Sequence, residues 1–231
     1  MKRLISFFVL ALCSTIMSAQ VKFDVSTLND AIAQFNKSKD SSKKKWAKNI
    51  LTLNQDSPTS GIFYRFVFPI SPEDTIIDMR KVQFAVSSFI NRNSSGRKIA
   101  IDWNDKNQIT LVTSLGQVAS YIAFLGREFD KYVQAVTRFD IEVKENRIRL
   151  TISVDKYYWS NKLGGFDERQ WAYVYRVAPY VSGDEEKVYS EAYINTCSSC
   201  LNEISEFMNI LSSNYNKQIV VKPDPYKDDN W

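Results

Sequence analysis

Histidine is absent from this sequence of 231 residues, and glycine is scarce, with only 7 residues. Without histidine, a Ser-His-Asp or Cys-His catalytic set and any His-ligated metal site are excluded. No glycine-based nucleotide-binding fingerprint occurs either. The hydrophobic, aromatic and charged fractions of 44%, 13% and 24% are those of an ordinary globular chain. These features favour a non-enzymatic protein with no cofactor and no metal, and they name no substrate.

The first residues of the chain indicate its compartment. Lys2 and Arg3 precede a short apolar run at 4–12, an order typical of a secretory signal peptide. The run is shorter than the roughly 20 apolar residues that span a bilayer, and small residues behind it allow cleavage after Ala19. We therefore expect residues 1–19 to be a signal peptide. The alternative, a buried N-terminal helix, is disfavoured by the order of positive charge followed by apolar residues.

Export has further consequences for attachment and partners. Cys13 is a candidate for lipidation, but the bulky Leu12 stands where a lipoprotein signal has a small residue, so a periplasmic or secreted protein is favoured over an anchored one. Loss of Lys2 and Arg3 lowers the net charge from +4 to +2. Such a balanced chain makes a nucleic-acid partner unexpected. No stretch after the signal peptide is apolar enough to be a transmembrane segment.

Composition divides the mature chain into four parts. Residues 20–60 have helical spacing followed by a turn-rich linker and form an N-terminal helical extension. Residues 61–160 form an α+β domain. Residues 161–222 form a loop-rich, helix-containing C-terminal extension that packs on the same domain, with its helix at about 195–213. Residues 223–231 form a polar tail that is expected to be mobile.

Strand and helix signals alternate in the first half of the α+β domain. Aromatic and β-branched residues predict a strand at 62–68. Ser71 as a cap and Pro72 in the first helical position predict an amphipathic helix at 72–91. Alternating residues around a polar turn predict a hairpin at 98–113. Residues 117–131 fit either a helix or an irregular strand.

The clearest alternation of apolar and polar residues surrounds Glu145-Asn146. It predicts long strands at 133–143 and 148–158 joined by a two-residue turn. The expected cross-strand pairs are Val143–Ile148, Ile141–Leu150 and Glu142–Arg149. Since one face of this hairpin is apolar and the other polar, we expect an antiparallel sheet with helices on the apolar face only.

The order β-α-β-β-β-β, followed by the C-terminal helix, resembles a known family, and the resembling part covers roughly residues 60–160. The resemblance is carried by the segments Tyr64-Arg65-Phe66, Ser71-Pro72-Glu73-Asp74, Phe139-Asp140-Ile141-Glu142-Val143 and Arg147-Ile148-Arg149-Leu150-Thr151-Ile152. They resemble the secreted bacterial envelope domains of unknown function that have a TATA-binding-protein-like fold. The resemblance implies a curved antiparallel sheet with helices on one face, and it supplies no activity and no catalytic residues. Binding of nucleic acid would rest on fold analogy alone.

Cys197 and Cys200 form a C-x-x-C motif in the last predicted helix. At a helix start, such a pair would act in thiol–disulfide exchange, with Cys197 as nucleophile and Cys200 as resolving thiol. No βαβ pattern surrounds the motif. Both cysteines also share one helical stripe with Leu201, Ile204 and other apolar residues. The stripe favours a buried thiol pair or a local structural disulfide over a redox site.

Aromatic residues gather after the hairpin. The members that form a candidate binding surface are Trp159, Phe166, Trp171, Tyr173 and Tyr175. Rings carried on loops stack on sugars or anchor a protein partner. The competing interpretation, that these rings close the end of the hydrophobic core, is favoured because large aromatic residues dominate core burial.

Together these observations predict an exported, non-enzymatic binding or structural module of the cell envelope, whose ligand is an envelope protein or a glycan. The alternative is an extracytoplasmic thiol–disulfide protein that uses Cys197 and Cys200. A third class, a carbohydrate hydrolase, needs two carboxylates facing each other across a cleft. Asp140 and Glu142 are instead expected to form surface salt bridges with neighbouring arginines.

Overall fold

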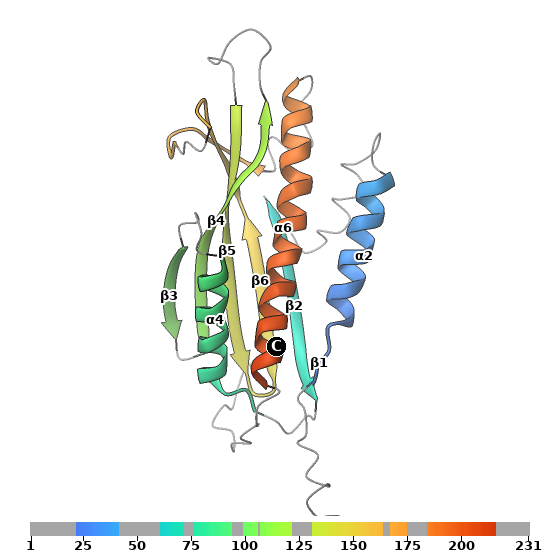
Figure 1. Cartoon of the computed structure of the whole chain (residues 1–231), viewed down its shortest axis with the longest axis vertical. Helices are drawn as coiled ribbons and strands as arrows, with labels where there is room; N and C mark the ends of the chain where they lie inside the picture. The colour runs from blue at the N-terminus through green and yellow to red at the C-terminus, as the bar shows by residue number, and fades with distance from the viewer. Residues whose placement is uncertain are drawn as a thin grey trace, which may run out of the picture.

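The chain is described by a computed structural model (Figure 1). The described residues are 22–41, 61–71, 76–93, 99–105, 107–121, 131–163, 167–174 and 184–215. The predicted signal peptide at 1–19, the linker that ends the N-terminal extension and the tail at 223–231 lie outside these ranges.

Eight strands and three helices make up the described part of the chain. The strands are β1 (Lys22–Phe23), β2 (Ile62–Ser71), β3 (Ile99–Asp105), β4 (Gln108–Tyr121), β5 (Lys131–Lys144), β6 (Arg147–Val154), β7 (Lys156–Ser160) and β8 (Trp171–Tyr173). The helices are α2 (Ser26–Ser41), α4 (Met79–Asn93) and α6 (Asp184–Tyr215).

The described strands form one curved antiparallel sheet in the order β1-β2-β6-β5-β4-β3. β5 is the central strand, and it changes partner along its length. Its second half pairs with β6, whereas its first half pairs with β7, which in turn pairs with β8. Figure 1 shows α6 running along the sheet with α4 beside its lower half. The predicted α+β class is confirmed.

The β5–β6 hairpin has the register that the sequence predicts. Val143 pairs with Ile148, and Glu142 lies opposite Arg149, whose Nε donates a hydrogen bond to the Glu142 carboxylate. The turn residue Glu145 has a φ of 49°, a left-handed conformation that tight two-residue turns require. Local alternation and turn length are therefore enough to predict this register.

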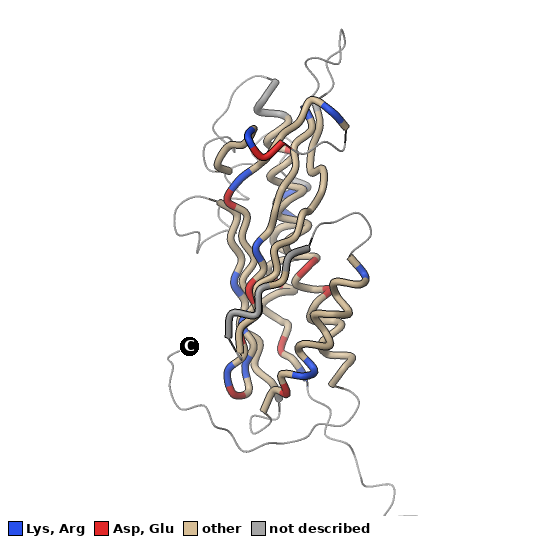
Figure 2. Tube along the Cα trace, turned by 90° about the vertical axis from the view of Figure 1, so that its left-hand side faces the viewer, with Lys and Arg blue, Asp and Glu red and all other residues tan. Residues whose placement is uncertain are grey.

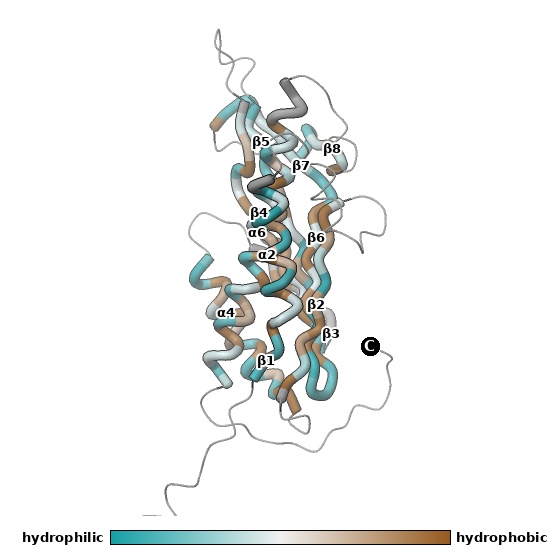
Figure 3. Tube along the Cα trace, turned by 90° about the vertical axis from the view of Figure 1, so that its right-hand side faces the viewer, coloured by the Kyte–Doolittle hydropathy of each residue, from teal (hydrophilic) through white to brown (hydrophobic). Residues whose placement is uncertain are grey.

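All three helices lie on the same side of the sheet (Figure 3). The centre of the core is a set of three phenylalanines, one each from α4, β5 and α6. The ring centroids of Phe89 and Phe139 are 6.1 Å apart, and Phe207 lies 6.1 Å and 5.7 Å from them, all edge to face. Such edge-to-face pairs stabilise beyond their burial. No described helix covers the opposite side, which we call the open face.

The N-terminal helix is part of this same core. Leu28 and Phe35 of α2 are 2% and 1% exposed, and both belong to the one hydrophobic cluster of the chain's described part. Just before α2, the ring of Phe23 meets that of Tyr215 edge to face at 5.5 Å. The described part of the N-terminal extension is therefore packed on the domain.

The predicted start of the helix at 72–91 is wrong. β2 continues through Ser71, which pairs with Lys22, and α4 begins at Met79. The preceding segment is held by the β5–β6 turn, because the N–H groups of Ile70 and Ile77 donate to the carbonyls of Asn146 and Glu145 at 2.9 and 3.1 Å. These long-range hydrogen bonds outweigh the local helix-start signal.

Asp78 takes over the capping role that the sequence assigned to Ser71. Its Oδ1 accepts a hydrogen bond from the backbone N–H of Arg80 at 3.0 Å, and its own carbonyl accepts from Lys81 at 2.9 Å. A carboxylate here also interacts favourably with the positive end of the helix dipole.

Three other elements differ from the predictions. The ambiguous stretch at 117–131 is strand as far as Tyr121, in a part of β4 that contains two register shifts, and residues 122–130 lie outside the described ranges. The strand predicted at 148–158 divides at Asp155 into β6 and β7. The last helix starts at Asp184, about three turns earlier than predicted, because buried residues such as Tyr189 continue its apolar stripe.

Candidate functional site

The open face carries an aromatic cluster where β7 and β8 meet. Tyr158 pairs with Trp171, and Lys156 pairs with Tyr173. The rings of Trp171 and Tyr173 meet edge to face at 5.0 Å and 79°. Lys156 Nζ lies 4.0 Å from the Trp171 ring centroid and 5.4 Å from that of Tyr173. A cation over the ring holds the indole in place, although Trp171 stays 39% exposed.

A shallow hollow of about 220 Å³ adjoins this cluster, since Lys156 and Tyr158 belong to the lining of the hollow. Its lining includes Val112, Val136, Arg138, Ser153, Lys156 and Tyr158, which come from β4, β5, β6 and β7. Arg138 is fixed by Asp140, whose Oδ2 accepts from its Nε at 3.0 Å. The hollow therefore combines two valines with hydroxyl groups, the Lys156 ammonium, the Arg138 guanidinium and the Asp155 carboxylate.

Charge on the sheet is mixed rather than of one sign. Figure 2 shows Lys and Arg interspersed with Asp and Glu along the strands. The two predicted ion pairs of the hairpin are present as Arg138–Asp140 and Arg149–Glu142. Asp140 also accepts a hydrogen bond from Thr110. These two carboxylates are occupied by their neighbours, as expected of surface salt bridges, and they do not face each other across a cleft.

The predicted aromatic surface is only partly assembled. Trp171 and Tyr173 lie together, but Trp159 pairs with Val133 and is on the side of the sheet that faces the helices. There, Lys131 Nζ lies 4.7 Å from the Trp159 ring centroid and 4.9 Å from that of Tyr189. Phe166 and Tyr175 lie outside the described residues.

Sequence reasoning missed the partners of Trp171. Lys156 and Tyr158 lie on the same face of the sheet as Trp171, because side chains alternate along a strand. The alternation that begins at residue 156 was the sequence pattern that could have predicted this. Arg138 and Ser153 reach the hollow from β5 and β6, and their approach depends on the sheet register. No local pattern predicts that meeting.

Cys197 and Cys200 are free thiols inside the core, each 0% exposed. They lie near the middle of the 32-residue α6, so the helix-start position that would activate Cys197 is not present. Burial raises the pKa of the Cys197 thiol to about 12. It also raises that of Cys200, where the nearby Glu203 adds to the effect. Because the thiolate is the nucleophile, this environment gives no support to thiol–disulfide exchange.

Other buried polar groups surround the thiols. The hydroxyls of Tyr64 and Tyr193 lie beside Cys197, and burial raises the pKa of Tyr64 well above its usual value. Within the described ranges, no group of three or more Cys, Asp or Glu side chains is placed to hold a metal ion. The cluster is a group of polar side chains buried in the core.

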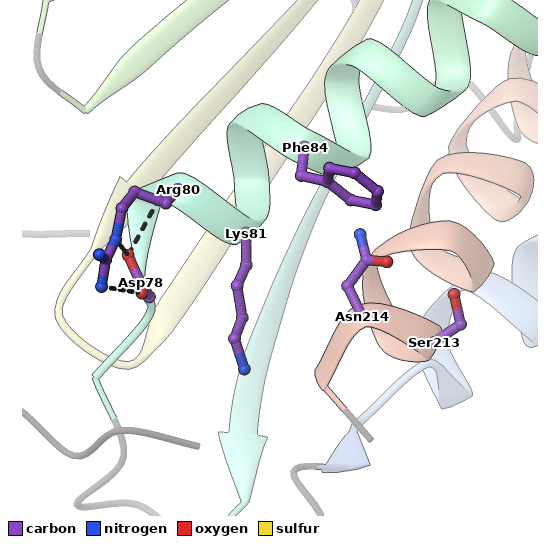
Figure 4. A pocket seen from close by; sticks show the side chains of 6 residues that line it. All are labelled: Asp78, Arg80, Lys81, Phe84, Ser213 and Asn214. Atoms are coloured by element: carbon purple, nitrogen blue, oxygen red, sulfur yellow. Dashed lines mark hydrogen bonds and ion pairs between the residues drawn. The ribbon is translucent and has the colours of Figure 1, made fainter. Parts of the chain in front are cut away.

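A second cleft of about 680 Å³ lies where α4 begins and α6 ends. The six side chains that line it are Asp78, Arg80, Lys81, Phe84, Ser213 and Asn214 (Figure 4). Arg80 is paired with Asp78 at 2.9 Å. Phe84 is 62% exposed, an unusual position for a phenylalanine on a helix that covers a core.

Comparison with known proteins finds likeness at the level of structure. No family model matches the chain, and no curated protein matches it. One similar solved structure is a TBP-like protein from Parabacteroides distasonis, with 10% identity, a TM-score of 0.41, and coverage of 65% of this chain and 92% of that one. Another is a DUF4468 family protein from Bacteroides ovatus, with 7% identity, a TM-score of 0.40, and coverage of 71% and 90%.

The first description carries the TBP-like name that the sequence resemblance also gave. Neither description names a ligand or an activity, so neither identifies the site. No described helix of this chain is long and apolar enough to cross a membrane.

Proposed function

We propose that this chain is an exported binding module of the cell envelope, and that the open face around Trp171 binds a glycan. The observation that carries the proposal is the fixed but exposed indole of Trp171, held by Lys156 at 4.0 Å beside a hollow. A flat aromatic face stacks on the C–H face of a sugar ring, and the neighbouring polar groups bind its hydroxyls.

The support comes from the position of these groups on paired strands. Trp171 and Tyr158 face one another across β7 and β8, so the stacking surface is part of the sheet and loses little conformational entropy when a ligand binds. Ser153 and Arg138 add a hydroxyl and a guanidinium group at the edge of the hollow. A volume of about 220 Å³ is small beside the ~300–1,000 Å³ of sites for drug-sized molecules, and it suits a single sugar unit of a longer chain.

Glycan binding is tested by co-sedimentation of the mature protein with purified peptidoglycan and with insoluble neutral and acidic polysaccharides. We expect Trp171→Ala to weaken binding by about tenfold, the effect of losing one stacked ring. Leu163→Ala is the control, because Leu163 is an apolar residue that is 76% exposed and belongs neither to the aromatic cluster nor to the lining of the hollow. Equal binding by Trp171→Ala and the unchanged protein would refute the proposal, as would a ligand that proves to be a protein.

Export is tested separately, by expression of the full chain and of a variant without residues 1–19 in a bacterial host. Lys2, Arg3 and the apolar run behind them support export. We expect the full chain in the periplasmic or extracellular fraction, shortened at its N-terminus, and the shortened variant in the cytosol. An uncut full chain in the cytosol would overturn this part of the proposal.

A further inference from the structure

The cleft between α4 and α6 is a second site, independent of the open face. Its two walls are joined at one end, because the Tyr215 hydroxyl accepts a hydrogen bond from the backbone N–H of Asp78 at 3.1 Å. Lys81 Nζ also lies 4.6 Å from the Tyr215 ring centroid. These contacts hold the start of α4 against the end of α6. The resulting volume of about 680 Å³ is within the usual ~300–1,000 Å³ of small-molecule sites.

One wall of the cleft is apolar and open to solvent. Phe84 projects from α4 with 62% of its surface exposed, and Figure 4 shows its ring and the Asn214 amide directed toward each other from the two helices. The side chains that bury α4 against the core lie elsewhere on the helix, at Val82, Ala85, Val86 and Phe89. Phe84 is therefore not needed for packing of α4, and its ring is available to an apolar ligand.

The polar groups of the cleft are mostly donors. The Nδ2 of Asn214 is buried and has no hydrogen-bond partner in the described part of the chain, which is an unfavourable state that an acceptor would relieve. Lys81 brings a positive charge to the same cleft. The carboxylate of Asp78 is already engaged by the backbone N–H, Nε and Nη2 of Arg80 at 3.0, 3.1 and 2.9 Å.

From this geometry we infer that the cleft binds a carboxylate carried on an apolar body. The carboxylate accepts from Asn214 Nδ2 and pairs with the Lys81 ammonium, while the apolar body lies on the Phe84 ring. Free fatty acids and apolar peptides with a free C-terminus both have this chemistry. A cationic amphiphile does not, because it would meet the Lys81 charge and an amide donor.

The test measures binding of decanoate to the mature chain by calorimetry, with decanol and decyltrimethylammonium as comparators. We expect saturable binding of decanoate that is at least about tenfold tighter than that of decanol, the ratio for one charge-assisted contact. A short apolar peptide with a free or an amidated C-terminus distinguishes the two sources of the carboxylate. Equal affinities for decanoate and decanol, or no binding of any carboxylate, would overturn the inference.

Two variants locate the binding in this cleft. Asn214→Asp replaces the amide donor by a like charge with little change of shape, and Lys81→Gln removes the cation. Both are expected to lower decanoate affinity by about tenfold or more. Lys162→Gln, at an exposed lysine outside both sites, is the charge-matched control and is expected to leave decanoate binding unchanged. Thermal unfolding checks that each variant is folded, and a folded Asn214→Asp protein with unchanged affinity would refute the assignment.

Discussion

The hydroxyl oxygen of Tyr215 accepts a hydrogen bond from the backbone N–H of Asp78 at 3.1 Å. Tyr215 is the last residue of α6, and Asp78 directly precedes α4, so this contact joins the end of α6 to the start of α4, in addition to the Phe89–Phe207 contact between the same helices. Tyr215 is 1% exposed, and burial raises the pKa of its hydroxyl. The bond also sets one end of the cleft that Phe84 lines.

Tyr215→Phe removes this hydrogen bond and keeps the ring. We expect the free energy of unfolding to fall by about 1 kcal/mol, the usual net value of one hydrogen bond with a partner left behind. Urea denaturation followed by circular dichroism measures the change. An unaltered transition midpoint would show that the contact contributes nothing to stability.

Gly61→Ala is expected to destabilise the start of β2. A Cβ at this position would overlap the carbonyl oxygen of Val154 and lie 3.1 Å from the Asp155 Cα. Because both neighbours are backbone atoms, the strands must separate, at a cost of about 1–3 kcal/mol. Gly116→Asn is the comparison, since that glycine has a φ of +72° and a Cβ added there would meet no atom within 4 Å, and asparagine tolerates this conformation. Equal melting temperatures for the two variants would contradict the steric account.

The two core cysteines are expected to resist thiol reagents in the folded protein. Both are fully buried, and the pKa of Cys197 is raised to about 12, so little thiolate forms near pH 8. Titration with a chromogenic disulfide should detect both thiols in denaturant and almost none without it. Rapid reaction of both thiols in the native protein would instead support a function in thiol–disulfide exchange.

Alkaline pH is expected to destabilise the fold through the same thiols. The pKa of Cys197 is raised by burial from 9.0 to about 12, so the unfolded chain loses this proton first. The contribution of the protonated Cys197 thiol to the free energy of unfolding is therefore complete below about pH 9. It decreases as the pH rises toward 12, by roughly 1.4 kcal/mol per pH unit for one thiol. Cys200 shifts in the same direction. Urea titrations between pH 8 and about 10.5 measure the slope, and Cys197→Ala should reduce it. A flat profile would contradict the assignment.

The open face and the core face of the hairpin were predictable because strand alternation is local. Even so, Thr137, which strand alternation places on the same side as Ile141 and Val143, meets Thr113 across β4 and β5, with their hydroxyl oxygens 2.6 Å apart. The two-residue alternation of a strand predicts that Thr137 is buried. Which residue it contacts is decided by the register between β4 and β5. That register contains two shifts, which no alternation pattern reveals.

The candidate site was less predictable than the fold. The sequence singled out Trp171 and Tyr173, and the structure places them together. It grouped Trp159 with them, yet Trp159 lies on the other side of the sheet because it pairs with Val133. Aromatic content along the chain indicates that rings are near one another, but only strand pairing decides which face each ring occupies. No sequence pattern predicts the cleft at Phe84, because its two walls come from segments far apart in the chain. Asp78 and Tyr215, which close one end of it, are separated by 137 residues.

The sequence by itself determined the α+β class, the two faces of the β5–β6 hairpin and the apolar stripe that buries Cys197, because each depends on periodicity within one element. The tertiary structure decided where α4 begins, how far α6 extends and which side chains meet at Trp171 and Phe84. These features depend on hydrogen bonds and packing between distant segments, such as those of Ile70 and Ile77 with the β5–β6 turn. Contacts of this kind outweigh local capping and propensity signals worth about 1 kcal/mol each.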